Sequence, residues 1–185
     1  MIDEVLAEVR ERMKKTIEAL QDDLLTLRTG RASPALVERL PVDYYGTPTP
    51  LNQIASIAVP EPRLLVIRPW DPSALAAIER AIQKSDLGLT PSNDGKLIRL
   101  NIPRLTEERR RDLVKLVSRR VEEARVSVRN LRRDALNDLK DFEKEKMISE
   151  DDFFEGKEEI QKLTDEFVDK IDAVGKRKEE EVMEV

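Results

Sequence analysis

The sequence contains no cysteine and no histidine among its 185 residues. Without cysteine the protein has no disulfide bond, no thiolate metal site and no cysteine nucleophile. Without histidine it has no Ser-His-Asp triad, no imidazole base and no ordinary zinc site. Any hydrolase or transferase chemistry would rest on aspartate and glutamate, so these two absences count against an enzyme.

Aromatic residues and long apolar runs are also scarce. Aromatics make up 4% of the chain and charged residues 38%, which is typical of long solvated helices rather than of an enzyme built round a deep apolar pocket. The longest apolar runs are far short of the roughly 20 residues that span a bilayer. The charged segment 1–15 has no signal-peptide core. We therefore predict a soluble, cytoplasmic protein without a membrane partner.

Proline is absent from residues 1–30 and 104–185, because all 10 prolines lie between Pro34 and Pro103. A proline inside a helix costs about 3 kcal/mol, so the two outer segments can form long helices and the middle cannot. We predict one domain made of 1–30 and 104–185, with a second domain, 31–103, inserted into it.

Hydrophobic spacing predicts three long helices in the outer segments. Apolar residues recur every three or four positions from Ile2 to Leu27, from Leu113 to Phe142 and from Ile160 to Val182. Helices of about 26, 40 and 34 residues would be about 40, 60 and 50 Å long. Thr106 and Ser149 suit the N-caps of the second and third. Since no helix buries its stripe alone, an elongated antiparallel three-helix bundle is the expected arrangement.

The inserted segment has a different pattern. Short aliphatic runs bounded by Pro, Gly and Asn predict strands at 40–45, 53–59, 64–67 and 97–102. Between the third and fourth strands, Asp71-Pro72-Ser73 opens a helix that ends before Gly88. The predicted fold class is therefore α+β, a three-helix bundle with a small inserted β/α/β domain.

The chain crosses between the two predicted domains at two places. A glycine and flanking prolines allow large backbone changes at few positions, as a hinge requires. The alternative is a rigid joint in which Gly30 is only the C-cap of the first helix. The predicted hinge residues are Thr29, Gly30, Arg31, Pro103, Arg104 and Leu105.

The net charge of −5 conceals an uneven distribution. Residues 104–133 carry 11 Lys+Arg against 5 Asp+Glu, net +6, whereas residues 134–185 carry 9 against 19, net −10. Nucleic-acid affinity depends on local positive potential, so the acidic overall balance does not exclude it.

Within the basic segment Arg125, Arg129 and Arg132 are spaced i, i+4, i+7 and form one line on a helix, with Arg133 beside Arg129. We call these four residues the arginine stripe. Guanidinium groups grip phosphate oxygens bidentately, so structured RNA is a fitting partner. The alternative is a solvated face that pairs with the acidic third helix.

Other patterns are weaker. Asp151 and Asp152 lack the spacing of a calcium loop and suit a helix start. No glycine-rich loop for phosphate is present, and Tyr44, Tyr45 and Trp70 do not form a base-stacking pattern. We find no catalytic constellation and expect no cofactor, no metal and no small-molecule substrate.

Seven runs, in order along the chain, resemble the bacterial ribosome recycling factor family. These runs are Arg28–Pro34, Val42–Pro50, Ser85–Leu89, Leu105–Arg110, Val128–Asp134, Ile148–Asp152 and Ile160–Asp165. The resemblance extends from end to end, and all the matched arginines are present.

The resemblance implies an L-shaped molecule of tRNA-like dimensions, with the bundle and the inserted domain joined by a hinge. It implies a monomeric translation factor that acts with elongation factor G and GTP to split the post-termination ribosome, releasing mRNA and tRNA. It assigns contacts with large-subunit ribosomal RNA to Arg129 and Arg132 first, then to Arg133, Arg125 and Arg28. The GTP would belong to the elongation factor. The competing interpretation is a coiled-coil adaptor that binds only proteins.

Overall fold

A computed structural model of the protein describes residues 1–184, which form two compact units. One unit is Leu25–Glu107, and the segments on either side of it form the other. The divisions fall after Leu24 and after Glu107, whereas the proline pattern predicted divisions after residues 30 and 103. Both connecting segments therefore belong with the smaller unit.

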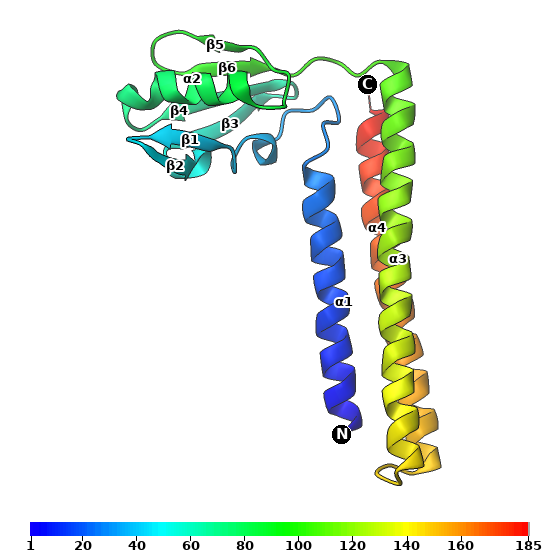
Figure 1. The fold of residues 1–185 in the computed structure, drawn as a ribbon. Coiled ribbons are helices and arrows are strands. Elements are labelled where there is room, and N and C mark those ends of the chain that lie inside the picture. The colour runs from blue at the N-terminus through cyan, green and yellow to red at the C-terminus, as the bar shows by residue number, and fades with distance from the viewer. Residues whose placement is uncertain (185) are drawn as a thin grey trace. The chain divides into compact units, whose positions relative to one another are not determined.

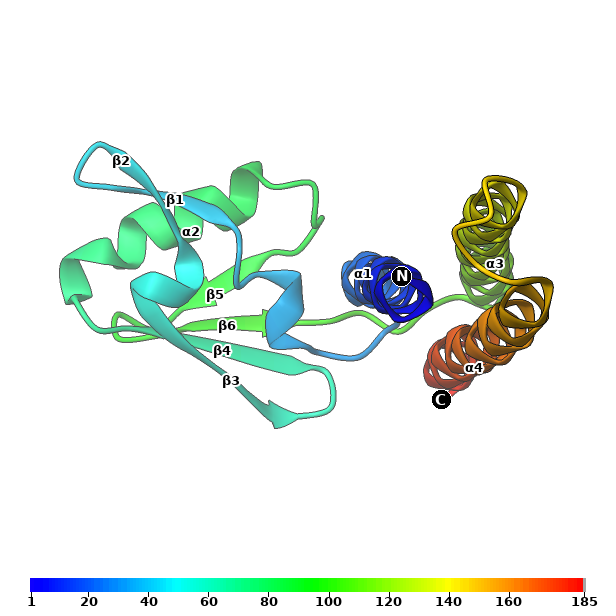
Figure 2. The same ribbon diagram turned by 90° about the horizontal axis from the view of Figure 1, so that it is seen from below.

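The first unit is a bundle of three helices, α1 (Ile2–Leu25), α3 (Glu107–Lys144) and α4 (Glu150–Met183). In this unit α3 runs antiparallel to both α1 and α4 (Figure 1), and Figure 2 views the three helices along their axes. Each helix buries the apolar stripe predicted from its spacing. The core includes Val9, Met13, Ile17, Leu20, Leu24, Leu113, Val117, Val121, Val128, Leu139, Ile160, Leu163, Phe167, Ile171 and Val182.

The first helix ends earlier than its hydrophobic spacing predicts. Leu27 lies beyond the end of α1 at Leu25, so its assignment to the helical stripe was wrong. Two features mark the segment that follows the helix. Arg28 donates from Nη1 to the carbonyl oxygen of Leu87 in the smaller unit, and Gly30 has a φ of 80°, which no helix accommodates.

The capping of α4 confirms the prediction for Ser149. The Ser149 hydroxyl accepts from the Asp152 amide at 3.0 Å, and the Asp152 carboxylate accepts from the Ser149 amide at 3.2 Å. This reciprocal pair is a capping box. It gives Asp152 a structural role at the helix start, as its position in the sequence indicated. The predicted start of α3 is also observed, because the helix begins at Glu107, directly after Thr106.

Two glycines set the spacing of α4 on α3. A Cβ added at Gly175 would lie 2.5 Å from Cγ2 of Val121, and one at Gly156 would lie 2.8 Å from Cδ1 of Leu139. Both distances are below any real carbon–carbon contact. The helices therefore approach more closely than side chains at these positions would allow, which makes the bundle tightly packed and stiff.

The smaller unit contains a four-stranded antiparallel sheet and a separate hairpin (Figure 1). The sheet order is β3 (Ala55–Glu61), β4 (Leu64–Pro69), β6 (Ile98–Asn101) and β5 (Pro91–Asn93). The hairpin pairs β1 (Pro41–Tyr44) with β2 (Thr47–Pro50), and helix α2 (Leu75–Lys84) packs against β1 and β5. This unit has its own core, centred on Leu65, Ile67, Ile78, Ile98 and Leu100.

The observed order of strands, one helix and further strands confirms the predicted α+β class. Strands β2 and β5 were not predicted, because their sequences, Thr-Pro-Thr-Pro and Pro-Ser-Asn, contain proline, which lacks the N–H that a strand donates to its neighbour. Both pair on one side only, and an edge strand tolerates a missing N–H. None of the helices within residues 1–184 combines the length and apolar character needed to cross a bilayer.

Candidate nucleic-acid interface

The arginine stripe lies on the second half of α3, a helix of 38 residues that contains neither proline nor glycine. Val121, Val128 and Leu139 anchor the neighbouring face of α3 in the bundle core, so the stripe lies along the flank of the bundle. Arg129 and Arg133 are exposed, and Arg125 and Arg132 are half-buried. A regular helix therefore holds the four guanidinium groups at fixed spacing.

Arg125 is paired within the bundle. Its Nε donates to Oδ1 of Asp172 on α4 at 2.7 Å, and its Nη1 donates to Oε2 of Glu122 at 2.8 Å. These hydrogen bonds, first to Glu122 and then to Asp172, raise the pKa of Arg125. Pairing with the acidic third helix, the alternative considered from the sequence, is thus realised at this one member of the stripe.

The other three arginines keep most of their charge uncompensated. Arg129 reaches a carboxylate only at 3.7 Å, at Oε1 of Glu122. Arg132 donates from Nη1 to the neutral amide oxygen of Gln161 at 3.2 Å, and Arg133 donates from Nη2 to that of Asn130 at 3.2 Å. Among the described residues no carboxylate pairs with Arg132 or Arg133. The positive potential therefore concentrates at Arg129, Arg132 and Arg133.

Gln161 orients Arg132 from the neighbouring helix. The Gln161 amide donates from Nε2 to Oδ1 of Asp165 at 2.8 Å, which leaves its oxygen turned towards the guanidinium of Arg132. No role of Gln161 was predicted from the sequence, although the residue lies in one of the family-like runs. Only the packing of α4 against α3 reveals that it positions the arginine.

Arg28 belongs to the smaller unit, whereas the four stripe arginines belong to the bundle. The Arg28 guanidinium donates to the carbonyl oxygen of Leu87 beside Gly88. This hydrogen bond directs the side chain towards the loop after α2, and the neutral carbonyl does not compensate its charge.

The predicted hinge residues come together where the chain enters and leaves the smaller unit. A Cβ at Gly30 would lie 3.3 Å from Cγ of Leu105, so the two connecting segments lie against each other at this point. Because α1 already ends at Leu25, Gly30 is not its C-cap, and this part of the rigid-joint alternative is wrong. The φ of 80° at Gly30 strains any other residue placed there.

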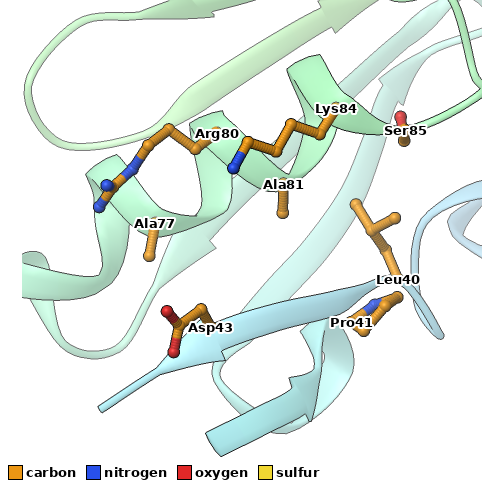
Figure 3. A pocket seen from close by; sticks show the side chains of 8 residues that line it. All are labelled: Leu40, Pro41, Asp43, Ala77, Arg80, Ala81, Lys84 and Ser85. Atoms are coloured by element: carbon orange, nitrogen blue, oxygen red, sulfur yellow. The ribbon is translucent and has the colours of Figure 1, made fainter. Parts of the chain in front are cut away.

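The smaller unit also has a groove of about 320 Å³ between α2 and β1 (Figure 3). Leu40, Ala77 and Ala81 give it apolar walls, while Arg80 and Lys84 from α2 and Asp43 from β1 carry its charges. None of the predicted RNA-contacting or hinge residues lines this groove, although Asp43 and Ser85 lie in two of the family-like runs. All of its lining residues belong to the smaller unit.

Comparison with known proteins agrees with this arrangement. The family model for ribosome recycling factor matches residues 20–183. The chain belongs to the ribosome recycling factor family. Proteins of this family are translation factors and not enzymes, so the absence of a catalytic constellation in the sequence agrees with the family.

Relatives match over the whole chain. The chain is 60% identical to the ribosome-recycling factor of Syntrophomonas wolfei and 57% identical to that of Bacillus licheniformis, in each case over 185 residues that cover 100% of both proteins. It is similar in fold to a ribosome recycling factor solved in solution, with a TM-score of 0.81 and 44% identity over 100% of this chain and 98% of the other.

A second structure describes a relative in a complex. The T. thermophilus ribosome recycling factor, described together with E. coli elongation factor G bound to the E. coli post-termination complex, is 52% identical to this chain. The TM-score is 0.70, and the match covers 100% of each chain.

Proposed function

We propose that the protein splits the post-termination ribosome together with elongation factor G and GTP, so that mRNA and tRNA leave and a new round of initiation can begin. Family membership supports this proposal, and so does the relative described with elongation factor G on the post-termination complex. The GTP belongs to the elongation factor. The protein acts as a monomer in the cytoplasm, where its ribosomal substrate is found.

The bundle is the part that anchors to large-subunit ribosomal RNA. The observation that carries this assignment is the guanidinium charge at Arg132 and Arg133, which donate only to neutral amide oxygens, together with Arg129, whose ion pair with Glu122 is long at 3.7 Å. Arginine forks bind phosphate oxygens with two parallel hydrogen bonds, and RNA helices are recognised largely through their phosphates and shape. Arg125 and Arg28 contribute less, because each already donates to a partner inside its own unit.

The mechanism is mechanical. The bundle, tightly packed at Gly156 and Gly175, transmits a displacement without bending. The smaller unit receives the force of the elongation factor, and Thr29, Gly30, Arg31, Pro103, Arg104 and Leu105 let the two units reorient. A glycine with positive φ beside a proline-containing segment favours such a hinge, because a few backbone angles can absorb the change.

A splitting assay tests the proposal. Post-termination ribosomes are mixed with the protein, elongation factor G and GTP, and the separation of subunits is followed by light scattering. We expect subunits to separate only when all three are present. Ribosomes that stay intact would overturn the proposal. A protein-only adaptor predicts in addition no co-sedimentation with large subunits, whereas the RNA-binding function predicts co-sedimentation that raised salt abolishes.

A further inference from the structure

The groove between α1 and α3 carries positive charge that the bundle does not use. At one end it forms a hollow of about 440 Å³. Its lining residues are Arg12, Lys15, Thr16, Ser127, Asn130, Leu131 and Asp134. Arg12 and Lys15 project from exposed positions of α1, and within residues 1–184 neither cation forms an ion pair with a carboxylate.

The next hollow along the same groove has a different character. It has a volume of about 390 Å³ and shares Thr16 and Ser127 with the first. Its charged residues satisfy one another, since Arg120 lies 3.3 Å from Asp23 and 3.9 Å from Glu123. Unpaired positive charge is therefore a property of one end of the groove only, which argues against a uniformly solvated surface.

This end of the groove also presents hydrogen-bond donors and hydrogen-bond acceptors. Asn130 accepts from Arg133 through its oxygen, which leaves its NH₂ group free to donate. The hydroxyl of Ser127 makes no hydrogen bond within the described part of the chain, and Asp134 supplies an acceptor. An RNA strand offers the complementary set, with phosphate oxygens for the donors and 2′-hydroxyls for the carboxylate.

The groove is continuous with the arginine stripe. Arg133 lies on the outer side of α3, and its hydrogen bond to Asn130 leads from the stripe to the groove wall. Positive and polar groups thus extend from Gln161 on α4, across Arg132 and Arg133 on α3, to Arg12 on α1.

We propose that the α1–α3 groove is a second binding site for the sugar–phosphate backbone of RNA. Arg12 and Lys15 hold phosphates, and Asp134 accepts from a 2′-hydroxyl. This inference rests on the proposed function, since the RNA is part of the large ribosomal subunit. An acidic protein segment is the other ligand that two cations would attract, and the experiment separates the two.

The experiment measures the affinity of labelled full-length variants for purified large ribosomal subunits at several salt concentrations. The variants are Arg12→Ala, Lys15→Ala and Arg12→Lys. Arg132→Ala is measured in parallel as a test of the stripe. The matched control is the double change Arg120→Gln with Asp23→Asn, which removes one arginine from the same groove together with its partner and keeps the net charge.

We expect Arg12→Ala and Lys15→Ala each to weaken binding by about 5- to 10-fold. Each should also lower the slope of log affinity against log salt by roughly 0.7 to 0.9, because one fewer phosphate is neutralised. Arg12→Lys should keep the wild-type slope, and the control should bind as wild type does. The melting temperature should stay unchanged, since both side chains are exposed.

Three outcomes would overturn the inference. Unchanged affinity in Arg12→Ala and Lys15→Ala, while Arg132→Ala binds weakly, would mean that RNA contacts the stripe and not the groove, and the proposed function would stand. A weakened affinity with an unchanged salt slope would mean that the groove binds a protein segment rather than a polyphosphate. Wild-type binding by all three alanine variants would instead argue against the RNA-binding role of the bundle as a whole.

Discussion

Replacing Arg132 by alanine removes a stripe arginine that pairs with no carboxylate of the described residues. Its guanidinium has five N–H donors, of which the bundle uses one, at Gln161, so the side chain can bind phosphate without giving up its internal contact. A hydrogen bond with a charged partner contributes about 1.5–3 kcal/mol, which corresponds to a loss in affinity of about 10- to 100-fold.

The assay is binding of the labelled protein to large ribosomal subunits over a salt series. Besides the weaker affinity, Arg132→Ala should reduce the slope of log affinity against log salt by roughly 0.7 to 0.9, as expected for one phosphate contact. Arg132→Lys should restore the slope and only part of the affinity, because lysine keeps the charge and loses the planar fork. Stability should change by no more than about 0.5 kcal/mol at this surface position.

The matched control removes a stripe arginine together with its internal partner. Arg125→Gln with Asp172→Asn deletes the ion pair between α3 and α4 and leaves the net charge unchanged. Since the Arg125 guanidinium is already occupied, this double variant should bind ribosomal subunits nearly as well as the wild type. Normal binding and an unchanged salt slope in Arg132→Ala would refute the reasoning and make the stripe a solvated face. Unfolding of Arg132→Ala would instead make the arginine structural.

The remaining predictions concern the bundle and the hinge. Gly175→Ala should destabilise the protein by about 1 kcal/mol, because overpacking against Val121 costs about 1–3 kcal/mol and better helix propensity returns about 1 kcal/mol. In a Val121→Ala background, which removes the overpacking, the same change should stabilise the protein. Thermal unfolding followed by circular dichroism measures both effects, and the same sign in both backgrounds would contradict the reasoning. Ser149→Ala should cost about 1 kcal/mol in the same assay by breaking the capping box, and an unchanged midpoint would show that the cap is dispensable. Since the chain has no cysteine, a disulfide engineered between the two units can be formed uniquely; it should preserve ribosome binding and impair splitting, and normal splitting by the locked protein would remove interdomain motion from the mechanism.

The sequence alone determined the features that depend on neighbours within a few turns of the chain. The distribution of proline separated the two kinds of segment, because a proline is costly inside a helix wherever that helix lies. The spacing of Met13, Ile17 and Leu20 identified a buried face, and Ser149 with Asp152 marked a helix start, since both patterns act over three or four residues. The spacing of Arg125, Arg129 and Arg132 predicted the stripe, and family-like runs such as Val128–Asp134 predicted its partner.

Only the tertiary structure decided which of the stripe arginines are available. Arg125 and Asp172 are 47 residues apart, and whether they meet depends on the register and rotation of α3 against α4. The same packing gave Arg132 a neutral partner in Gln161 and placed Gly175 against Val121. No sequence pattern within a single helix predicts either contact. A long-range contact also follows the end of α1 at Leu25, where Arg28 donates to the carbonyl oxygen of Leu87. The positions of charged and apolar residues can be read from the sequence of one helix, whereas the cancellation of charge depends on which helices lie side by side.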